Sequence, residues 1–224
     1  MVTRGDLART TLVEVAERLF AERGIEGVSL RDISAAAGQR NHSAAQYHFG
    51  DRVGLVAAVF DHRMREVNER RHHMLDELEA AGRSDDLERL VEATVRPLIE
   101  VVEETHGWYA RFLVRTRWDV FAQRVLTDVP ALSSLRRAFE LIGPHIDGDF
   151  DVRIDRLDQM ATLFIGTIAG WEWRRERGQG APSAGELCAD LTATCRAVLM
   201  ARVHDRLPGV DAATRRADLA RSTR

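Results

Sequence analysis

Proline is absent from the first 96 residues of this 224-residue chain, and this absence constrains the fold strongly. Proline breaks a helix because it removes a backbone donor and blocks the preceding turn, so a proline-free stretch is open to helix throughout. Within this stretch, apolar residues recur at steps of three and four, as at Leu12, Val15 and Leu19, which places them on one helix face. Alternating strand patterns of four or more residues are nearly absent. The sequence therefore predicts an all-α fold.

Glycines and capping residues indicate where the helices begin and end. Gly24, Gly38 and Gly50 each follow a periodic segment, and Ser29 with Asp32 forms an acidic version of the capping box. Asp51 is expected to cap a long fourth helix. The predicted helices span residues 7–23, 29–38, 42–48, 51–81, 84–104, 107–124, 132–145, 153–177 and 184–204, about nine in all.

Overall charge and hydropathy exclude a membrane protein and give no general attraction to nucleic acid. The formal net charge is −3 at pH 7. The longest uncharged stretch of the apolar C-terminal half, residues 160–171, is too short to cross a bilayer. The N-terminus lacks the apolar run of a signal peptide. We therefore expect a soluble, cytoplasmic protein that binds no membrane.

An enzyme would need a catalytic or cofactor-binding constellation, and the sequence shows none. The eight histidines include no i,i+4 pair with a third metal ligand, and no phosphate loop or glycine-rich nucleotide motif occurs. We expect no catalysis, cofactor or metal. Cys188 and Cys195 lie about 10 Å apart along one predicted helix, too far for a disulfide with each other. Buried packing is the expectation for both, with a cross-subunit bridge or a redox sensor as the alternative.

Residues 9–55 contain three short predicted helices, each with an apolar stripe too small to bury itself. The second and third, with Gly38 between them, predict a helix-turn-helix, whose second helix enters the major groove of DNA. No acidic residue lies from Arg40 to Phe49, and Arg52 follows near a helix N-terminus that favours phosphate. The alternative is an ordinary hairpin with a solvated polar face. The predicted reading face combines side chains that bond bases or phosphates: Arg40, Asn41, His42, Ser43, Gln46, Tyr47 and His48.

The same segment resembles the DNA-binding domain of the TetR family of transcriptional regulators. The matching pieces are Leu19-Phe20-Ala21-Glu22-Arg23-Gly24, Val28-Ser29-Leu30-Arg31-Asp32-Ile33, Ala37-Gly38 and Tyr47-His48-Phe49, followed by Arg52 and Leu55. The resemblance implies a helix-turn-helix DNA-binding domain at 1–50 and a helical ligand-binding and dimerisation domain at 51–204. Within the latter, residues 51–81 form a linking helix, and residues 205–224 are a C-terminal tail.

The resemblance also implies roles for individual residues. Ser43, Gln46, Tyr47 and His48 would be the DNA contacts of the recognition helix, and Ser29, Arg31 and Arg52 would contact phosphates. Phe20, Ile33 and Phe49, and Tyr47 in part, would hold the three helices together.

The turn departs from the family pattern. From Gly38 to Tyr47 the chain has two residues more than the family's usual spacing. The start of the recognition helix therefore has two alternatives: Asn41 is its N-cap, or Ser43 caps it in a capping box with Gln46.

Aromatic residues concentrate in the C-terminal part and predict either an apolar ligand cavity or ordinary core. An arginine among them could bind the carboxylate or phosphate of a ligand, although a solvated helix face is its alternative fate. The candidate ligand-binding residues are His106, Trp108, Phe112, Arg115, Trp118, Phe164 and Trp171.

The last two predicted helices each carry a long apolar stripe. Paired across a two-fold axis, such stripes form a four-helix bundle, and the family resemblance implies the same homodimer. The candidate interface residues are Leu157, Phe164, Ile168, Leu187, Leu191, Cys195 and Val198.

Together these features predict a ligand-responsive regulator. A small hydrophobic or amphipathic effector in the C-terminal domain would favour one spacing of the two DNA-binding domains and so release a palindromic operator. Repression relieved by ligand is the commoner behaviour in the family, with activation as an alternative. A helical small-molecule-binding or interaction module without specific DNA binding is the rival function.

Overall fold

The computed structural model describes residues 4–119, 122 and 132–201. Every regular element among these residues is helical, which confirms the all-α prediction. The predicted tail, 205–224, lies outside the described residues. The helix expected at 107–124 is shorter than predicted, because it ends at Arg117 and the next two residues are not helical. The helices are α1 (Arg4–Arg23), α2 (Leu30–Ala36), α3 (Ala44–Phe49), α4 (Arg52–Ala80), α5 (Leu87–Thr105), α6 (Tyr109–Arg117), α8 (Ser133–Ile142), the 3₁₀ helix η2 (Gly143–His145), α9 (Phe150–Glu176) and α10 (Ala184–Leu199).

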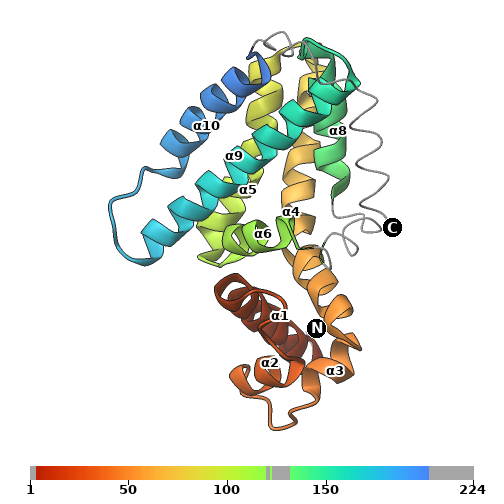
Figure 1. Cartoon of the computed structure of the whole chain (residues 1–224), viewed down its shortest axis with the longest axis vertical. Helices are drawn as coiled ribbons and strands as arrows, with labels where there is room; N and C mark the ends of the chain where they lie inside the picture. Colours follow the sequence, from red (N-terminus) through yellow and green to blue (C-terminus); the bar gives the residue numbers. More distant parts are fainter. Residues whose placement is uncertain (1–3, 120–121, 123–131, 202–224) are drawn as a thin grey trace, which may run out of the picture.

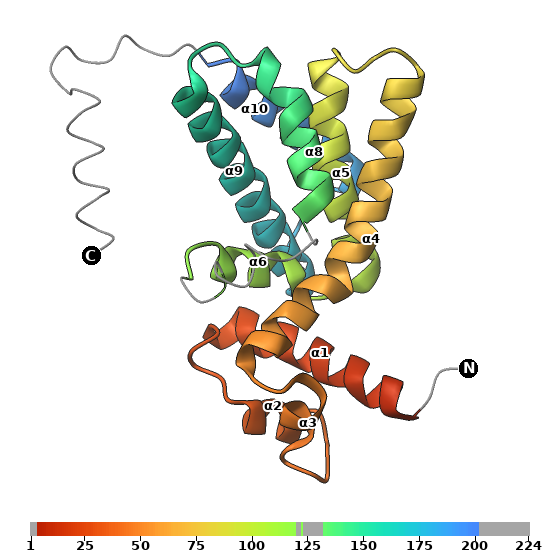
Figure 2. The same ribbon diagram turned by 90° about the vertical axis from the view of Figure 1, so that its right-hand side faces the viewer.

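The helices form two parts joined by α4 (Figures 1 and 2). Helices α1, α2 and α3 make a small N-terminal unit at one end of the molecule. Helices α5, α6, α8, α9 and α10 make a larger C-terminal body, and α4 runs from the N-terminal unit along this body. Helix α6 lies across the end of the body and packs on both α1 and α9. Contact between the two parts is therefore made by α4 and by the α1–α6 pair.

Helix α4 begins where the sequence predicts. The Asp51 carboxylate accepts a hydrogen bond from the Gly54 N–H at 2.8 Å, which caps one of the unpaired donors of the first turn. Buried side chains then recur along the helix from Leu55 to Leu75, so α4 packs on α1 and α3 at one end and on α5 and α8 further along.

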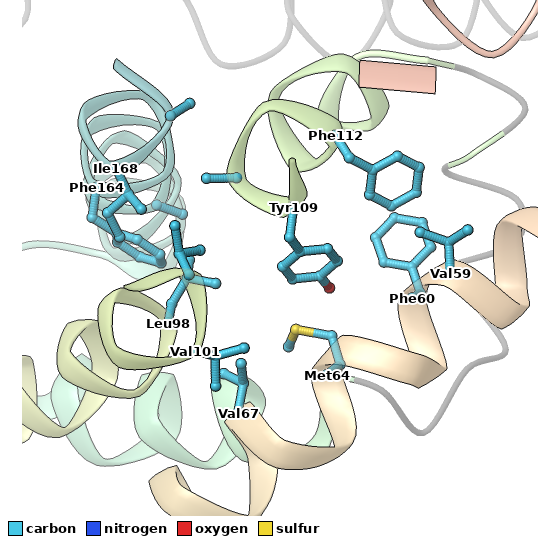
Figure 3. Close-up of a cluster of buried hydrophobic side chains, with 14 of the residues drawn as sticks. Val59, Phe60, Met64, Val67, Leu98, Val101, Tyr109, Phe112, Phe164 and Ile168 are labelled. Carbon is cyan, nitrogen blue, oxygen red and sulfur yellow. The ribbon is translucent and has the colours of Figure 1, made fainter. Parts of the chain in front are cut away.

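A continuous apolar core lies where α4, α5, α6 and α9 meet (Figure 3). Phe112 of α6 packs on Phe60 of α4, with ring centroids 4.9 Å apart, and on Phe20 of α1 at 6.3 Å. Tyr109 and Met64 are both buried in this core. Burial raises the pKa of the Tyr109 phenol, and its hydroxyl makes no hydrogen bond within the described residues. The contacts of Phe112 extend the core across the boundary between the two parts.

Arg71 of α4 is buried in the body, with 2% of its surface exposed. Its guanidinium donates to the Thr94 carbonyl oxygen from Nε and Nη2, at 3.1 and 2.9 Å, and from Nη1 to the Ser134 Oγ at 2.9 Å. Burial lowers the pKa of this guanidinium to about 10. These bonds connect α4 to α5 and α8.

The helix boundaries differ from the predicted ones mainly near prolines and chain reversals. The helix expected at 132–145 ends at Ile142 and continues as η2, which contains Pro144. The final helix ends at Leu199 rather than 204, and Ser183 with Glu186 forms a capping box at its start. Among the helices described, none combines the length and hydropathy that crossing a membrane requires. Cys188 and Cys195 are buried free thiols, and burial raises the pKa of Cys195 to about 12.

Candidate nucleic-acid interface and ligand pockets

A buried serine holds α3 against α2. The Ser34 Oγ accepts a hydrogen bond from the Ala45 N–H at 3.0 Å and donates to the Leu30 carbonyl oxygen at 2.9 Å. Ile33, Ala44 and Ala45 are buried beside it, and the small alanines let α3 lie close to its neighbours. One face of α3 is therefore packed against the rest of the N-terminal unit, and the opposite face is exposed to solvent.

The turn before α3 is held by Asn41 rather than by Ser43. Gly38 has φ +65°, and the Asn41 Oδ1 accepts the Ser43 N–H at 2.9 Å, an Asx turn. Ser43 occupies the N-cap position, but its side chain makes no cap hydrogen bond. Both predicted alternatives are therefore wrong: Asn41 is not the N-cap of α3, and Ser43 forms no capping box with Gln46. The helix starts at Ala44, two residues after the predicted start, because the longer turn is closed by the asparagine.

The outward face of α3 and its turn carries the predicted reading residues. Arg40, Asn41, His42, Ser43 and Gln46 are all exposed. Tyr47 is 84% exposed and packs edge-on against the His48 ring at 5.3 Å. The expectation that Tyr47 partly holds the helices together is wrong, because its ring points to solvent; His48 and Phe49 are half-buried instead. The face is polar and free of carboxylates.

The predicted phosphate-binding residues flank this face. Arg31 is exposed in the first turn of α2, and Arg52 is half-buried in the first turn of α4. Ser29 forms the predicted capping box: its Oγ accepts the Asp32 N–H at 3.1 Å and donates to the Asp32 carboxylate at 2.6 Å. These hydrogen bonds lower the pKa of Asp32. The Ser29 hydroxyl is thus engaged in stabilising α2.

A groove of about 590 Å³ lies between α8 and the start of α9, and we call it the α8–α9 groove. Sequence reasoning missed it. Phe150 and Ile154 in its wall are 75% and 48% exposed, which is unusual for large apolar side chains. The available signal was the spacing of Phe150, Ile154 and Leu157, which places all three on one face of α9. Its lining residues are Leu132, Leu135, Arg136, Phe139, Glu140, Gly143, Pro144, Phe150, Arg153, Ile154 and Leu157.

A second, more polar cavity of about 460 Å³ contains three of the predicted ligand-binding residues, His106, Trp108 and Trp171; we call it the Trp108 cleft. Arg111 stacks on the Trp108 ring at 3.6 Å and donates from Nε to the Glu172 carboxylate at 2.7 Å. The backbone N–H groups of Ala110 and Arg111 also donate to this carboxylate, each at 3.2 Å. Desolvation outweighs these favourable contacts and raises the pKa of Glu172 to about 7.

The remaining predicted ligand-binding residues do not converge. Arg115 lines a third cavity, between α1, α6 and the end of α9, and donates to the Ala21 carbonyl oxygen at 3.3 Å. Trp118 is 72% exposed, whereas Phe112 and Phe164 are buried in the core. The seven residues therefore fall into separate environments rather than one pocket, because they lie on different faces of α6 and α9.

The predicted dimer stripes are packed inside one protomer. Helix α10 packs on α5 and α9, and α9 packs on α6 and α5. These contacts cover the inward side chains of both helices, so a partner protomer would have to contact the outward faces instead. Leu157, Phe164, Ile168, Leu187, Leu191 and Cys195 are buried, and Val198 is half-buried.

Comparison with known proteins identifies the N-terminal part of the chain. Residues 12–59 match the family described as bacterial regulatory proteins of the tetR family. Over 62 residues the chain is 42% identical to an HTH-type transcriptional repressor of Mycobacterium tuberculosis, and equally to an HTH-type transcriptional regulator of Mycobacterium bovis. Each match covers 28% of this chain and 32% of the relative, so the similarity spans about a third of each relative.

Solved structures extend the similarity of fold to most of the chain. The TetR family transcriptional regulator PfmR from Thermus thermophilus is 19% identical, with a TM-score of 0.53 over 84% of this chain and 96% of that one. The fatty acid degradation regulator FadR from Bacillus halodurans is 14% identical, with a TM-score of 0.55 over 87% of this chain and 99% of that one. At such low identity these matches establish the fold alone. Residues 12–59 therefore match the N-terminal domain of the bacterial tetR family, and the fold of most of the chain is similar to that of solved TetR-family regulators.

Proposed function

We propose that the protein is a transcriptional regulator that binds operator DNA through α3 and represses until an effector releases it. The observation that carries this proposal is the outward face of α3 and its turn: exposed Arg40, Asn41, Gln46 and Tyr47, with no carboxylate among them, on a helix fixed by Ser34. Arginine and glutamine form bidentate hydrogen bonds with guanine and adenine in the major groove. A helix that is only solvated would not require this combination of base-bonding side chains without a carboxylate.

Positioning on the DNA would come from residues around the helix. Arg31 and Arg52 lie at the first turns of α2 and α4, where the backbone N–H groups and the helix dipole also favour phosphate. His42, Ser43 and His48 extend the same polar surface. Both the hydroxyl and the backbone N–H of Ser29 donate to the Asp32 carboxylate, so phosphate binding near this position would come from the N-terminus of α2 rather than from Ser29 itself.

The regulator would act as a homodimer that reads two half-sites. Because the inward stripes of α9 and α10 are already packed, we assign the dimer contact to their outward faces. Such a dimer places two copies of α3 on one side of the assembly, as a palindromic operator requires.

The effector would be a small hydrophobic or amphipathic molecule bound in the α8–α9 groove. A volume of about 590 Å³ lies in the range of small-molecule sites, and the exposed Phe150 and Ile154 supply an apolar wall. Ligand binding there would bias α9, which packs on α6, and α6 packs on α1 of the N-terminal unit. The Trp108 cleft is the alternative effector site.

DNA binding is tested by a mobility-shift titration against the DNA flanking the protein's own gene, with salt varied. Wild type should bind in a steeply salt-dependent manner, and the double variant Gln46→Ala/Tyr47→Ala should lose roughly tenfold or more in affinity. Gln179→Ala, at an exposed position of the loop between α9 and α10, is the matched control and should bind as wild type. If genome-wide selection also yields no bound sequence, the proposal fails and the small-molecule-binding module replaces it.

The effector site is tested with the fluorescent amphiphile 8-anilinonaphthalene-1-sulfonate as a probe. Ile154→Glu places a negative charge in the groove wall and should weaken binding of this anionic probe about tenfold, because the carboxylate repels the sulfonate and replaces part of the apolar wall. Val114→Glu, at a similarly exposed apolar position of α6, is the control and should bind normally. Equal loss in both variants, or none in Ile154→Glu, would remove the groove as the effector site.

A further inference from the structure

Glu17 of α1 is a buried acid at the boundary between the N-terminal unit and the body. Only 1% of its surface is exposed. Its Oε2 accepts a hydrogen bond from the Arg63 Nε of α4 at 2.7 Å, and its Oε1 accepts one from the Trp108 N–H at 2.8 Å. Trp108 is the N-cap residue of α6. One carboxylate of the N-terminal unit therefore binds both helices that connect this unit to the body.

Gly107 makes this close approach possible. A Cβ on Gly107 would lie 2.7 Å from the Glu17 Oε1, and 3.3 and 3.4 Å from atoms of Thr105 and Arg63. The carboxylate is held by two hydrogen bonds, so it cannot yield without losing them. The backbone φ of Gly107 is not positive, so any L-residue could adopt this backbone conformation. The requirement for glycine at this position is therefore steric.

The first turn of α6 is thus bound by carboxylates from two directions. Glu17 of α1 takes the Trp108 N–H, and Glu172 of α9 takes the N–H groups of Ala110 and Arg111. The Trp108 cleft borders the same turn. A shift of α9 or a ligand in the cleft would therefore act on the turn that holds α1.

Beyond Glu17, α1 and α6 are joined by apolar contacts, as between Phe20 and Phe112, and by one longer hydrogen bond, 3.3 Å from the Arg115 Nε to the Ala21 carbonyl oxygen. Apolar contacts have little directional preference, whereas hydrogen bonds to a buried carboxylate fix distance and angle. We propose that Glu17 is a positioning residue, which fixes the orientation of the DNA-binding unit on the body and so determines operator affinity. This inference rests on the proposed DNA-binding function. If the orientation is loosened, only a fraction of molecules is competent to bind both half-sites, and apparent affinity falls by that fraction.

The test compares Gly107→Ala in two backgrounds, using an operator selected in vitro with wild-type protein. In the wild-type background, the added methyl group displaces the carboxylate and should weaken operator binding about tenfold. In the Glu17→Ala background the clash is absent, so the same substitution should cost less than twofold. Gly185→Ala, where an added Cβ meets no atom within 4 Å, is the control and should have no effect. An equal cost in both backgrounds, or no cost in the wild-type background, overturns the proposal.

Two further measurements separate positioning from simple loss of folding. In Glu17→Ala, which removes the acceptor of the Trp108 N–H, hydrogen exchange at the Trp108 amide should accelerate at least tenfold while amides of α5 keep their protection. The salt dependence of DNA binding should keep the wild-type slope, because phosphate contacts are unchanged. Exchange that accelerates equally throughout the chain would reduce Glu17 to a structural role and overturn the proposal. Failure of wild type to bind any selected DNA would instead refute the proposed function, with the Trp108 exchange still reporting whether the Glu17 contact exists.

Discussion

At the scale of single residues, Glu172 predicts a pH dependence of stability. Its pKa is raised from an ordinary 4.5 to about 7 in the folded chain, because burial outweighs its contacts with Arg111. Between these pH values the folded chain keeps a proton on Glu172 that the unfolded chain has released. Raising the pH through this window should therefore lower the free energy of unfolding, by on the order of 2 kcal/mol.

Urea unfolding of wild type and Glu172→Gln at pH 5 and pH 8 measures this effect. The variant should lack this part of the pH dependence. Glu176→Gln is the matched control, since Glu176 pairs with the Nη1 of the same arginine at 2.7 Å but from a more exposed position. Identical pH dependence in wild type and Glu172→Gln would contradict the raised pKa.

At the scale of single elements, the sequence predicts what depends on nearby residues. The caps at Ser29 and Asp51 are confirmed because each is a bond between residues three apart in the chain. The Ser43 cap fails because Asn41 closes the longer turn first. The stripe from Leu187 to Cys195 is correctly read as apolar, but periodicity does not say which helix covers it, and in the structure α5 and α9 do.

Helix α3 has six residues, too few to be stable by itself, so it depends on tertiary contacts such as the Ser34 bond. Ser34→Ala would leave the buried Ala45 N–H without its acceptor and should cost about 1–3 kcal/mol of stability in the N-terminal unit. Thermal unfolding and DNA titration should both show the loss. Ser43→Ala is the control, since that exposed hydroxyl makes no cap bond. Equal effects of the two substitutions would contradict this role of Ser34.

At the scale of the whole molecule, the sites lie where distant segments meet, and this limits prediction from sequence. Glu17 contacts a residue 91 positions away, and nothing in its local pattern distinguishes it from a surface acid. The α8–α9 groove exists because Phe139 and Phe150 belong to two helices that leave space between them. The exposed polar face of α3 was predictable because all its residues belong to one short segment.

The proposed dimer makes the last prediction, at the same scale. Helices α9 and α10 lie side by side (Figure 1), and the outward face of α9 carries exposed Thr162 and Gly166. A Cβ on Gly166 would meet no atom within 4 Å, so Gly166→Glu should leave the protomer intact. Glutamate also favours helix over glycine, but a charge placed in a close helix–helix interface is costly without a partner. The variant should therefore remain helical and become monomeric.

Sedimentation and circular dichroism of the variant would check this prediction, together with operator binding, which should weaken because one protomer reads only one half-site. Gly180→Glu carries the same charge change in the loop before α10, again with no atom near an added Cβ, and should remain dimeric. A dimeric Gly166→Glu would place the interface on another face. A monomeric wild type would contradict the proposed dimer. Two protomers would then associate only when both are bound to the operator.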